Sequence, residues 1–267
     1  MAVEIINLKY DGLFKNENIV IQDNQITSIV GKNGSGKTTL LKLIYNLDTN
    51  FIEKISIGEK IVDRTSLKQE KRMLRESVAY LQQDYRKLIY DLDIYENIKE
   101  NSKIVDLKKM NLLLKSFKLD ENILKKDFCS LSNGELKKYL IVYTLSKKSK
   151  VILLDDVLNG LDQKSIDILK KVLKQEKRDG KTIILTTQNS DFLLNVCDSV
   201  VTINDKKVKK YCNKYEFFED INMLKKVSLI MPEILKFRKK VLNSKKIKLI
   251  YRDNTNDLIK DIYRNAK

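Results

Sequence analysis

Short runs of mostly apolar residues recur along the chain, separated by stretches with helical spacing. The runs at 25–30, 151–154 and 181–187 lack a regular polar alternation, which is typical of strands buried on both faces of a parallel sheet. Residues 163–178 follow a helical period, and Gly180 beyond them is a good helix stop. Strands that alternate with helices in this way predict a parallel α/β sheet.

The same pattern divides the chain into regions. Residues 3–8 and 18–21 are predicted as short strands ahead of the sheet. Helical periodicity dominates from about 85 to 148, with the clearest helices at 93–100 and 107–119, so a helix-rich insertion interrupts the α/β pattern. We therefore predict a main domain at 1–207, with a helical subdomain at about 85–148, and a small α+β appendage at 208–267 that serves an accessory or dimerisation role.

Composition narrows the class of protein. With 267 residues, of which 42% are hydrophobic and 33% charged, the chain can bury one large core and carry an appendage. Its apolar runs are far shorter than the roughly 20 residues of a membrane span, and the N-terminus does not resemble a signal sequence. We expect a soluble protein, so any membrane function must come from a partner. The absence of histidine excludes His-based acid–base catalysis and His-ligated metal sites.

The net charge of +16 is unevenly spread, with its greatest excess beyond residue 207. An anionic partner, either a membrane surface or nucleic acid, is one interpretation. Lysine-rich, solvated helix faces are the other. The three cysteines show no paired spacing, which suits a reducing cytosol.

The octapeptide GKNGSGKT at residues 31–38 matches the phosphate-loop pattern at every defined position. It follows a predicted strand and opens a predicted helix, so its backbone N–H groups and the helix N-terminus can face phosphate groups. Lys37 is expected to reach the β- and γ-phosphates, and Thr38 to offer its hydroxyl to Mg²⁺. The expected nucleotide-binding residues of this loop are Gly31, Lys32, Asn33, Gly34, Ser35, Gly36, Lys37, Thr38 and Thr39.

Four further motifs follow in a fixed order: VAYLQQD, SLSNGE, VILLDD and NGLD. With the phosphate loop, they resemble the glutamine loop, signature, Walker B motif and D-loop of ATP-binding cassette (ABC) ATPases. The resemblance covers about residues 1–205 and implies an α/β P-loop NTPase fold, with a RecA-like parallel core plus antiparallel β and helical subdomains. It also implies ATP and Mg²⁺ as ligands.

The resemblance assigns roles to individual residues. Asp155 corresponds to the carboxylate that binds Mg²⁺, and Gln83 to the glutamine that contacts Mg²⁺ and water, with Gln82 as the alternative. Asp156 and Gln188 stand at the catalytic positions. In this family a nucleotide lies between two cassettes, so Ser132 and Gly134 of the signature would act on a partner's nucleotide. An aromatic residue near the N-terminus stacks on adenine; Tyr10 is the candidate, with Phe14 behind it.

The chain departs from the family pattern mainly at the positions that the resemblance assigns to ATP hydrolysis. Asp156 replaces the usual glutamate, and Gln188 replaces the usual histidine. Water attack requires a carboxylate within hydrogen-bond reach, and aspartate is one methylene shorter. A reacting group misplaced by about 1 Å can lower a rate by about 10²-fold. We therefore expect intact ATP binding, slow hydrolysis at this chain's own site, and an asymmetric pair with a more conventional cassette.

The most economical interpretation is the ATP-binding subunit of a transporter. The alternatives are a soluble ABC ATPase acting outside transport and an ATP-binding regulatory subunit. The span between Thr38 and Leu131 is too short for the long coiled coils of DNA-repair cassettes, so no nucleic-acid partner is expected. The expected partners are transmembrane subunits and a second ABC ATPase, with a heterodimer favoured over a homodimer. The chain would then be cytoplasmic and peripheral on the inner face of the cell membrane.

The tail carries a weaker resemblance. Its segments SLIMPEILKFRKKVL and DNTNDLIKDIYR are similar to the C-terminal domain of energy-coupling-factor ATPases. An unrelated dimerisation tail is the alternative.

Overall fold

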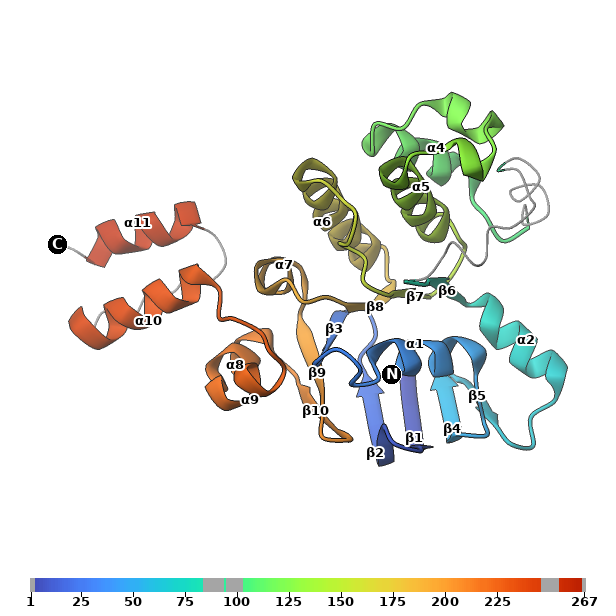
Figure 1. Ribbon diagram of the computed structural model, residues 1–267, viewed down its shortest axis with the longest axis horizontal. Helices are drawn as coiled ribbons and strands as arrows, with labels where there is room; N and C mark the ends of the chain where they lie inside the picture. The colour runs from blue at the N-terminus through green and yellow to red at the C-terminus, as the bar shows by residue number, and fades with distance from the viewer. Residues whose placement is uncertain (1–2, 84–93, 95–102, 246–254, 266–267) are drawn as a thin grey trace.

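The computed structural model describes residues 3–83, 94, 103–245 and 255–265. Its elements form layers around a central sheet (Figure 1). The helices within residues 107–178 lie on one side of this sheet, and the helix at residues 37–46 with a second sheet lies on the other. The arrangement agrees with the α/β P-loop architecture expected from the sequence.

The central sheet has six strands in the order β10-β9-β3-β8-β7-β6. Strands β6, β7, β8, β3 and β9 run parallel, and β10 pairs with β9 in the antiparallel sense. The three runs predicted as buried strands are confirmed as β3, β7 and β8. The bounds are β3 Ile26–Val30, β6 Val78–Leu81, β7 Val151–Leu154, β8 Thr182–Thr186, β9 Ser199–Asn204 and β10 Lys207–Tyr211.

Strand β7 shows why its sequence has no polar alternation. Val151 and Leu153 belong to the apolar cluster facing the second sheet, whereas Ile152 and Leu154 belong to the cluster facing the helices. Successive strand residues point to opposite faces, so a strand covered on both faces must be apolar throughout. This central position places the end of β7, and the two aspartates that follow it, inside the protein.

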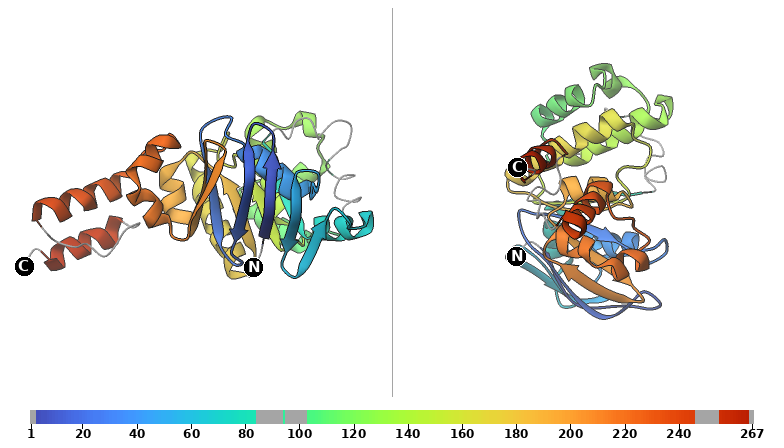
Figure 2. Two further views of the ribbon diagram at one scale, coloured as in Figure 1. Left: turned by 90° about the horizontal axis from the view of Figure 1, so that it is seen from below. Right: turned by 90° about the vertical axis from the view of Figure 1, so that its left-hand side faces the viewer.

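The second sheet is antiparallel, with strand order β2-β1-β4-β5. It packs against α1 in one apolar cluster that includes Phe14, Leu41 and Ile55. Figure 2 shows this sheet as a separate layer. The bounds are β1 Val3–Tyr10, β2 Phe14–Ile21, α1 Lys37–Asn46, β4 Ile52–Ile57 and β5 Lys60–Asp63.

The region between β6 and β7 is helical in the described residues, as predicted. The helix expected at 107–119 is confirmed as α4, whereas the one expected at 93–100 lies outside the described residues except for Ile94. A helix that the pattern did not predict, α2, precedes this region. The bounds are α2 Lys68–Glu76, α4 Leu107–Ser116, the short 3₁₀ turns Glu121–Lys125 and Phe128–Ser130, and α5 Asn133–Leu145.

Two helices of the core complete the layers. The helix predicted at 163–178 is confirmed as α6, Gln163–Arg178, and α7 spans Ser190–Val196. Asp162 caps α6, since its side chain accepts a hydrogen bond from Ser165 N. Leu169 and Leu173 of α6 are fully buried against the sheet.

The tail differs in detail from the α+β appendage expected. Its strand is β10, which belongs to the central sheet, and every described element after it is a helix. Helices α10 and α11 extend away from the two sheets at one end of the molecule (Figures 1 and 2). The helices are α8 Lys214–Glu219, α9 Ile221–Lys226, α10 Glu233–Lys245 and α11 Thr255–Asn265.

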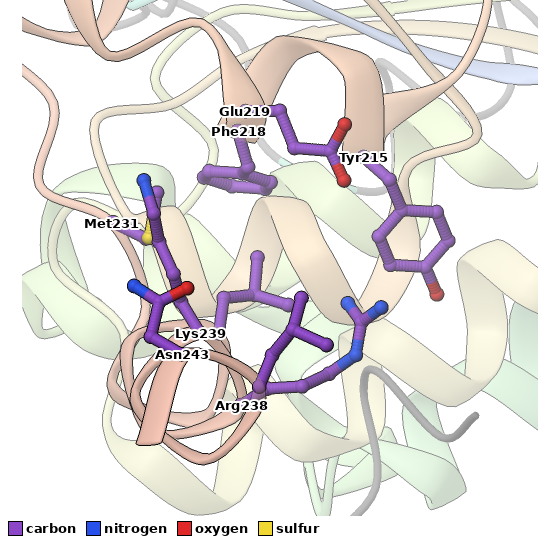
Figure 3. Close-up of a pocket in the computed structure, with 9 residues that line it drawn as sticks. Tyr215, Phe218, Glu219, Met231, Arg238, Lys239 and Asn243 are labelled. Atoms are coloured by element: carbon purple, nitrogen blue, oxygen red, sulfur yellow. The ribbon is translucent and has the colours of Figure 1, made fainter. Parts of the chain in front are cut away.

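A small hollow of about 240 Å³ lies between α8 and α10 (Figure 3). Apolar residues such as Phe218 and Leu235 line it together with the charged residues Glu219, Arg238 and Lys239. All of its lining residues come from the tail, so it is separate from the phosphate loop. None of the helices within the described ranges combines the length and apolar composition of a membrane span.

Candidate nucleotide site

The phosphate loop joins the end of β3 to the start of α1. Gly31 has no room for a side chain, because a Cβ atom there would lie 2.6 Å from the main-chain oxygen of Ile203. Gly36 caps α1 with φ 102°, a left-handed conformation that favours glycine. These two glycines let the chain turn tightly into a helix whose N-terminus is open to an anion.

Lys37 is the first residue of α1, and its side chain folds back over the loop. The Nζ atom donates hydrogen bonds to the main-chain oxygens of Gly31 at 2.8 Å and Lys32 at 2.9 Å. Burial lowers the pKa of Lys37, while the carboxylates of Asp155 and Asp156 oppose this shift. The ammonium group is thus already placed among the groups that would meet a bound phosphate.

Asp155 directly follows β7 and is 1% exposed. Its Oδ1 accepts a hydrogen bond from Thr186 Oγ1 at 2.7 Å, whereas its buried Oδ2 has no hydrogen-bond partner among the described residues. A buried oxygen that lacks a partner is costly, and hard oxygen donors are the ligands that Mg²⁺ prefers. Asp155 therefore fits a Mg²⁺ ligand, and Thr38 lines the same cleft.

Side chains form hydrogen bonds with both the N–H and the carbonyl oxygen of Asp156. Its N–H donates to Thr186 Oγ1 at 2.7 Å, and its carbonyl oxygen accepts from Lys137 Nζ at 3.3 Å. The residue has φ 47°, in the left-handed region that few residues other than glycine adopt. Its carboxylate accepts a hydrogen bond from Asn159 Nδ2 at 3.3 Å.

Gln188 follows β8 and lines the same cleft. Its Nε2 atom donates to the main-chain oxygen of Gly31 at 2.8 Å, so the side chain bridges the segment after β8 and the phosphate loop. Gln83, just beyond β6, lines the same cleft, and its neighbour Gln82 is not among the lining residues. Polar groups at the ends of β6, β7 and β8 therefore converge on the loop after β3.

These groups line one cleft of about 650 Å³, within the size range of ligand sites. It contains most of the residues predicted from the loop, together with Gln83, Asp155, Asp156 and Gln188. Sequence reasoning missed four residues, of which Thr186 could have been found because it ends the buried strand next to the one that Asp155 follows. The missed lining residues are Leu13, Asn159, Thr186 and Thr187.

Neither of the two residues predicted to contact adenine, Tyr10 and Phe14, is among the described residues that line this cleft. The ring of Tyr10 packs against Phe51 with centroids 4.5 Å apart. Phe14 is buried beneath Gly36 and contributes to the core. Leu13 lies between them in sequence and lines the cleft. The role of Tyr10 stays a prediction.

The signature lies at the start of α5. Ser132 is the N-cap, and its Oγ donates to Glu135 Oε2 at 2.6 Å while accepting from Glu135 N at 3.3 Å. The hydrogen bonds from Ser132 lower the pKa of Glu135. Ser132 is exposed, and neither it nor Gly134 is among the residues that line the cleft.

Comparison with known proteins shows the family to which the sequence is similar. Residues 14–159 match the family model described as ABC transporter. A Pyrococcus abyssi protein, whose name places it among ABC transporter ATP-binding proteins, is 30% identical over 243 residues, which is 88% of each chain. An energy-coupling factor transporter ATP-binding protein, EcfA2 of Clostridium perfringens, is 29% identical over 88% of this chain and 85% of its own.

Solved structures share the fold. CbiO1 from Clostridium perfringens, described as part of the ABC transporter complex cbiONQ, matches with a TM-score of 0.68 at 24% identity, covering 89% of this chain and 98% of its own. A dimeric ATP-binding cassette bound to ADP and Pi matches with a TM-score of 0.62 at 22% identity, covering 78% and 97%. At these levels of identity, the two matches show a shared fold.

Proposed function

The chain belongs to the ABC transporter family of ATPases, and on that premise we propose that it powers a membrane transporter by ATP-driven dimerisation with a second cassette. The cleft supports the binding half of this proposal. The loop after β3, the N-terminus of α1 and Lys37 surround the space in which a triphosphate would lie. The proposal of dimerisation rests on the signature.

The observation that carries the proposal is the position of Ser132 and Gly134 outside the chain's own cleft. Ser132 is exposed at the N-terminus of the thirteen-residue helix α5, where main-chain N–H groups favour an anion. A phosphate-binding surface that cannot serve the chain's own nucleotide can serve the nucleotide of a facing cassette. Two such chains would then enclose ATP between the loop of one and the signature of the other.

The cleft also supports a hydrolytic reaction. Asp156 would accept the proton of the attacking water, and Gln188 would donate a hydrogen bond to a phosphate oxygen. Asp155 and Thr38 would hold Mg²⁺, with Gln83 beside them. When bound, this ion would neutralise negative charge on the β- and γ-phosphates.

We propose that hydrolysis at this site is slow. The carboxylate of Asp156 is one methylene shorter than that of glutamate, and Gln188 carries no positive charge to balance the charge on the phosphates. The second cassette would supply the faster site, completed by Ser132 and Gly134 of this chain. This arrangement favours a heterodimer, because a homodimer would repeat the weakened pair in both sites.

The names of the relatives support a transport role, since they include ABC transporter and energy-coupling factor transporter ATP-binding proteins. The chain would associate with the inner face of the cell membrane through transmembrane subunits. Its tail would act as an accessory or dimerisation domain.

Co-purification of the tagged chain from its native host tests the proposal. We expect mass spectrometry to identify a second cassette and membrane subunits, and the two cassettes to associate more strongly with ATP than with ADP. The Lys37→Ala variant is the control, because it should lose the ATP dependence. Recovery of the chain as a monomer under both conditions, with no membrane protein bound, would contradict the proposal.

A further inference from the structure

Lys137 is a buried lysine that the site described above does not use. It lies in the second turn of α5, five residues after Ser132, and only 3% of its surface is exposed. The residues around it in the helix, Leu136 and Tyr139, belong to the apolar core. Removing an ammonium group from water is costly unless a charge or a strong acceptor compensates.

The compensation comes from the hydrolytic side of the cleft. Lys137 Nζ donates to the main-chain oxygen of Asp156 at 3.3 Å. Burial lowers the pKa of Lys137, and the carboxylates of Asp156 and Asp155 oppose the shift, with Asp156 the stronger of the two. For Lys37, Asp155 is the stronger. The two aspartates therefore interact electrostatically with two lysines, the half-buried Lys37 and the buried Lys137.

The contact falls on a strained point of the main chain. Asp156 adopts φ 47°, which costs energy for a residue with a Cβ atom and persists only where the surroundings enforce it. Thr186 fixes the N–H of this residue and Lys137 fixes its carbonyl oxygen. These two contacts set the main-chain angles from which the carboxylate projects.

We infer that Lys137 is a positioning residue for ATP hydrolysis: it holds the main chain of Asp156 so that the carboxylate points at the attacking water. This inference rests on the proposed role of Asp156 as the group that accepts the proton. It gives a reason for a lysine in a core position, where an apolar residue of similar length would avoid the cost of burial. It also provides a compensation for a short carboxylate, since aspartate has less reach and tolerates less misplacement than glutamate.

Replacement of Lys137 by methionine tests the inference, because methionine keeps much of the volume and removes the donor. We expect kcat of the chain, assembled with its partner cassette inactivated at the partner's own site, to fall about tenfold, as for a small misplacement of a reacting group. The KM for ATP and the affinity for Mg²⁺–ATP should stay within about twofold of wild type, since Lys137 does not line the cleft. Lys137→Arg, which keeps a charged donor, should recover part of the rate.

Lys147→Met is the matched control. Lys147 lies just beyond the same helix, its pKa is also lowered by burial, and its ammonium lies 4.9 Å from the ring centre of Tyr143. This variant should keep the wild-type kcat. If Lys137→Met does not fold, Lys137→Gln serves in its place, and a wild-type kcat in whichever variant folds would overturn the inference.

A double variant separates the inference from the proposed function. If Lys137 acts through Asp156, the Lys137→Met substitution should cause no further loss in an Asp156→Asn background. A full additional tenfold loss would show that Lys137 acts elsewhere. Asp156→Asn with wild-type turnover would overturn the role of Asp156 itself. Loss of turnover in Asp156→Asn with an unaffected Lys137→Met would overturn only the inference about Lys137.

Discussion

The two walls of the nucleotide cleft are built in different ways. The phosphate wall comes from one segment, residues 33–39, and we expect it to bind phosphate mainly through main-chain N–H groups and the start of α1. The hydrolytic wall consists of side chains at the ends of three different strands, namely Gln83, Asp156, Thr186 and Gln188. A substitution in the second wall changes a reacting group directly, whereas the first wall depends on a backbone shape that glycines maintain. The family pattern is complete in the first wall and altered in the second, so binding and hydrolysis can be separated by mutation.

Lys37→Ala gives the largest expected effect and tests the phosphate wall. Its ammonium would form charge-assisted hydrogen bonds with the nucleotide, worth about 3 kcal/mol, which is about a 100-fold loss of ATP affinity. Isothermal titration calorimetry with Mg²⁺–ATP measures this loss. An affinity equal to that of wild type would show that the wall does not bind through Lys37.

Asp156→Glu tests the hydrolytic wall through an expected gain of activity. The longer side chain should reach the attacking water, and we expect kcat of the chain's own site to rise at least tenfold with little change in ATP affinity. Steady-state phosphate release by the purified chain, alone and with its partner cassette, provides the measurement. Asp156→Asn is the matched loss of charge and should reduce turnover to a low residual rate. Brisk hydrolysis by the isolated wild-type chain, lost in Asp156→Asn, would instead show that the aspartate pair is sufficient and that no second cassette is required.

The difference between the walls also explains what the sequence could reveal. The cleft-lining residues of the phosphate wall were predictable from one motif, because they are contiguous in sequence and the glycines of the motif have fixed conformational roles. Asp155 was predictable because it directly follows a buried apolar run that resembles the Walker B motif. The support given by Thr186 and Lys137 was not predicted, since it depends on how β8 and α5 pack against the end of β7.

The fold shows the same limit. Apolar periodicity identified the buried strands and α6, but α2 has only Leu74 buried, and Met73 and Leu74 are its only apolar residues. The place of β10 in the central sheet depends on pairing with β9, which a local pattern cannot fix. The helices of the tail were therefore assigned to a unit with a strand of its own.

Ser132→Ala should affect the partner's nucleotide and leave the chain's own cleft intact. Loss of one hydrogen bond to a charged phosphate predicts about a tenfold fall in turnover at the partner's site. The heterodimer should be assayed with the chain's own site inactivated by Lys37→Ala, so that only the partner's turnover is measured. Calorimetry on the isolated Ser132→Ala chain should give wild-type ATP affinity. If its affinity falls instead, the signature serves the chain's own nucleotide, and the two-chain arrangement must be revised.

Tyr10→Ala has the smallest expected effect and tests how far the phosphate wall extends towards the base. Stacking on adenine predicts a loss of about 1 kcal/mol, or about fivefold in ATP affinity. Tyr10 packs against Phe51 in the structure, so part of any loss could come from disturbing that contact. Tyr10→Phe keeps the ring and is the matched control: it should bind ATP as wild type does. The affinity for inorganic triphosphate, which has no base, should be unchanged in Tyr10→Ala. Equal losses for ATP and triphosphate would show that the substitution distorts the loop, and an unchanged ATP affinity would show that Tyr10 does not contact the base.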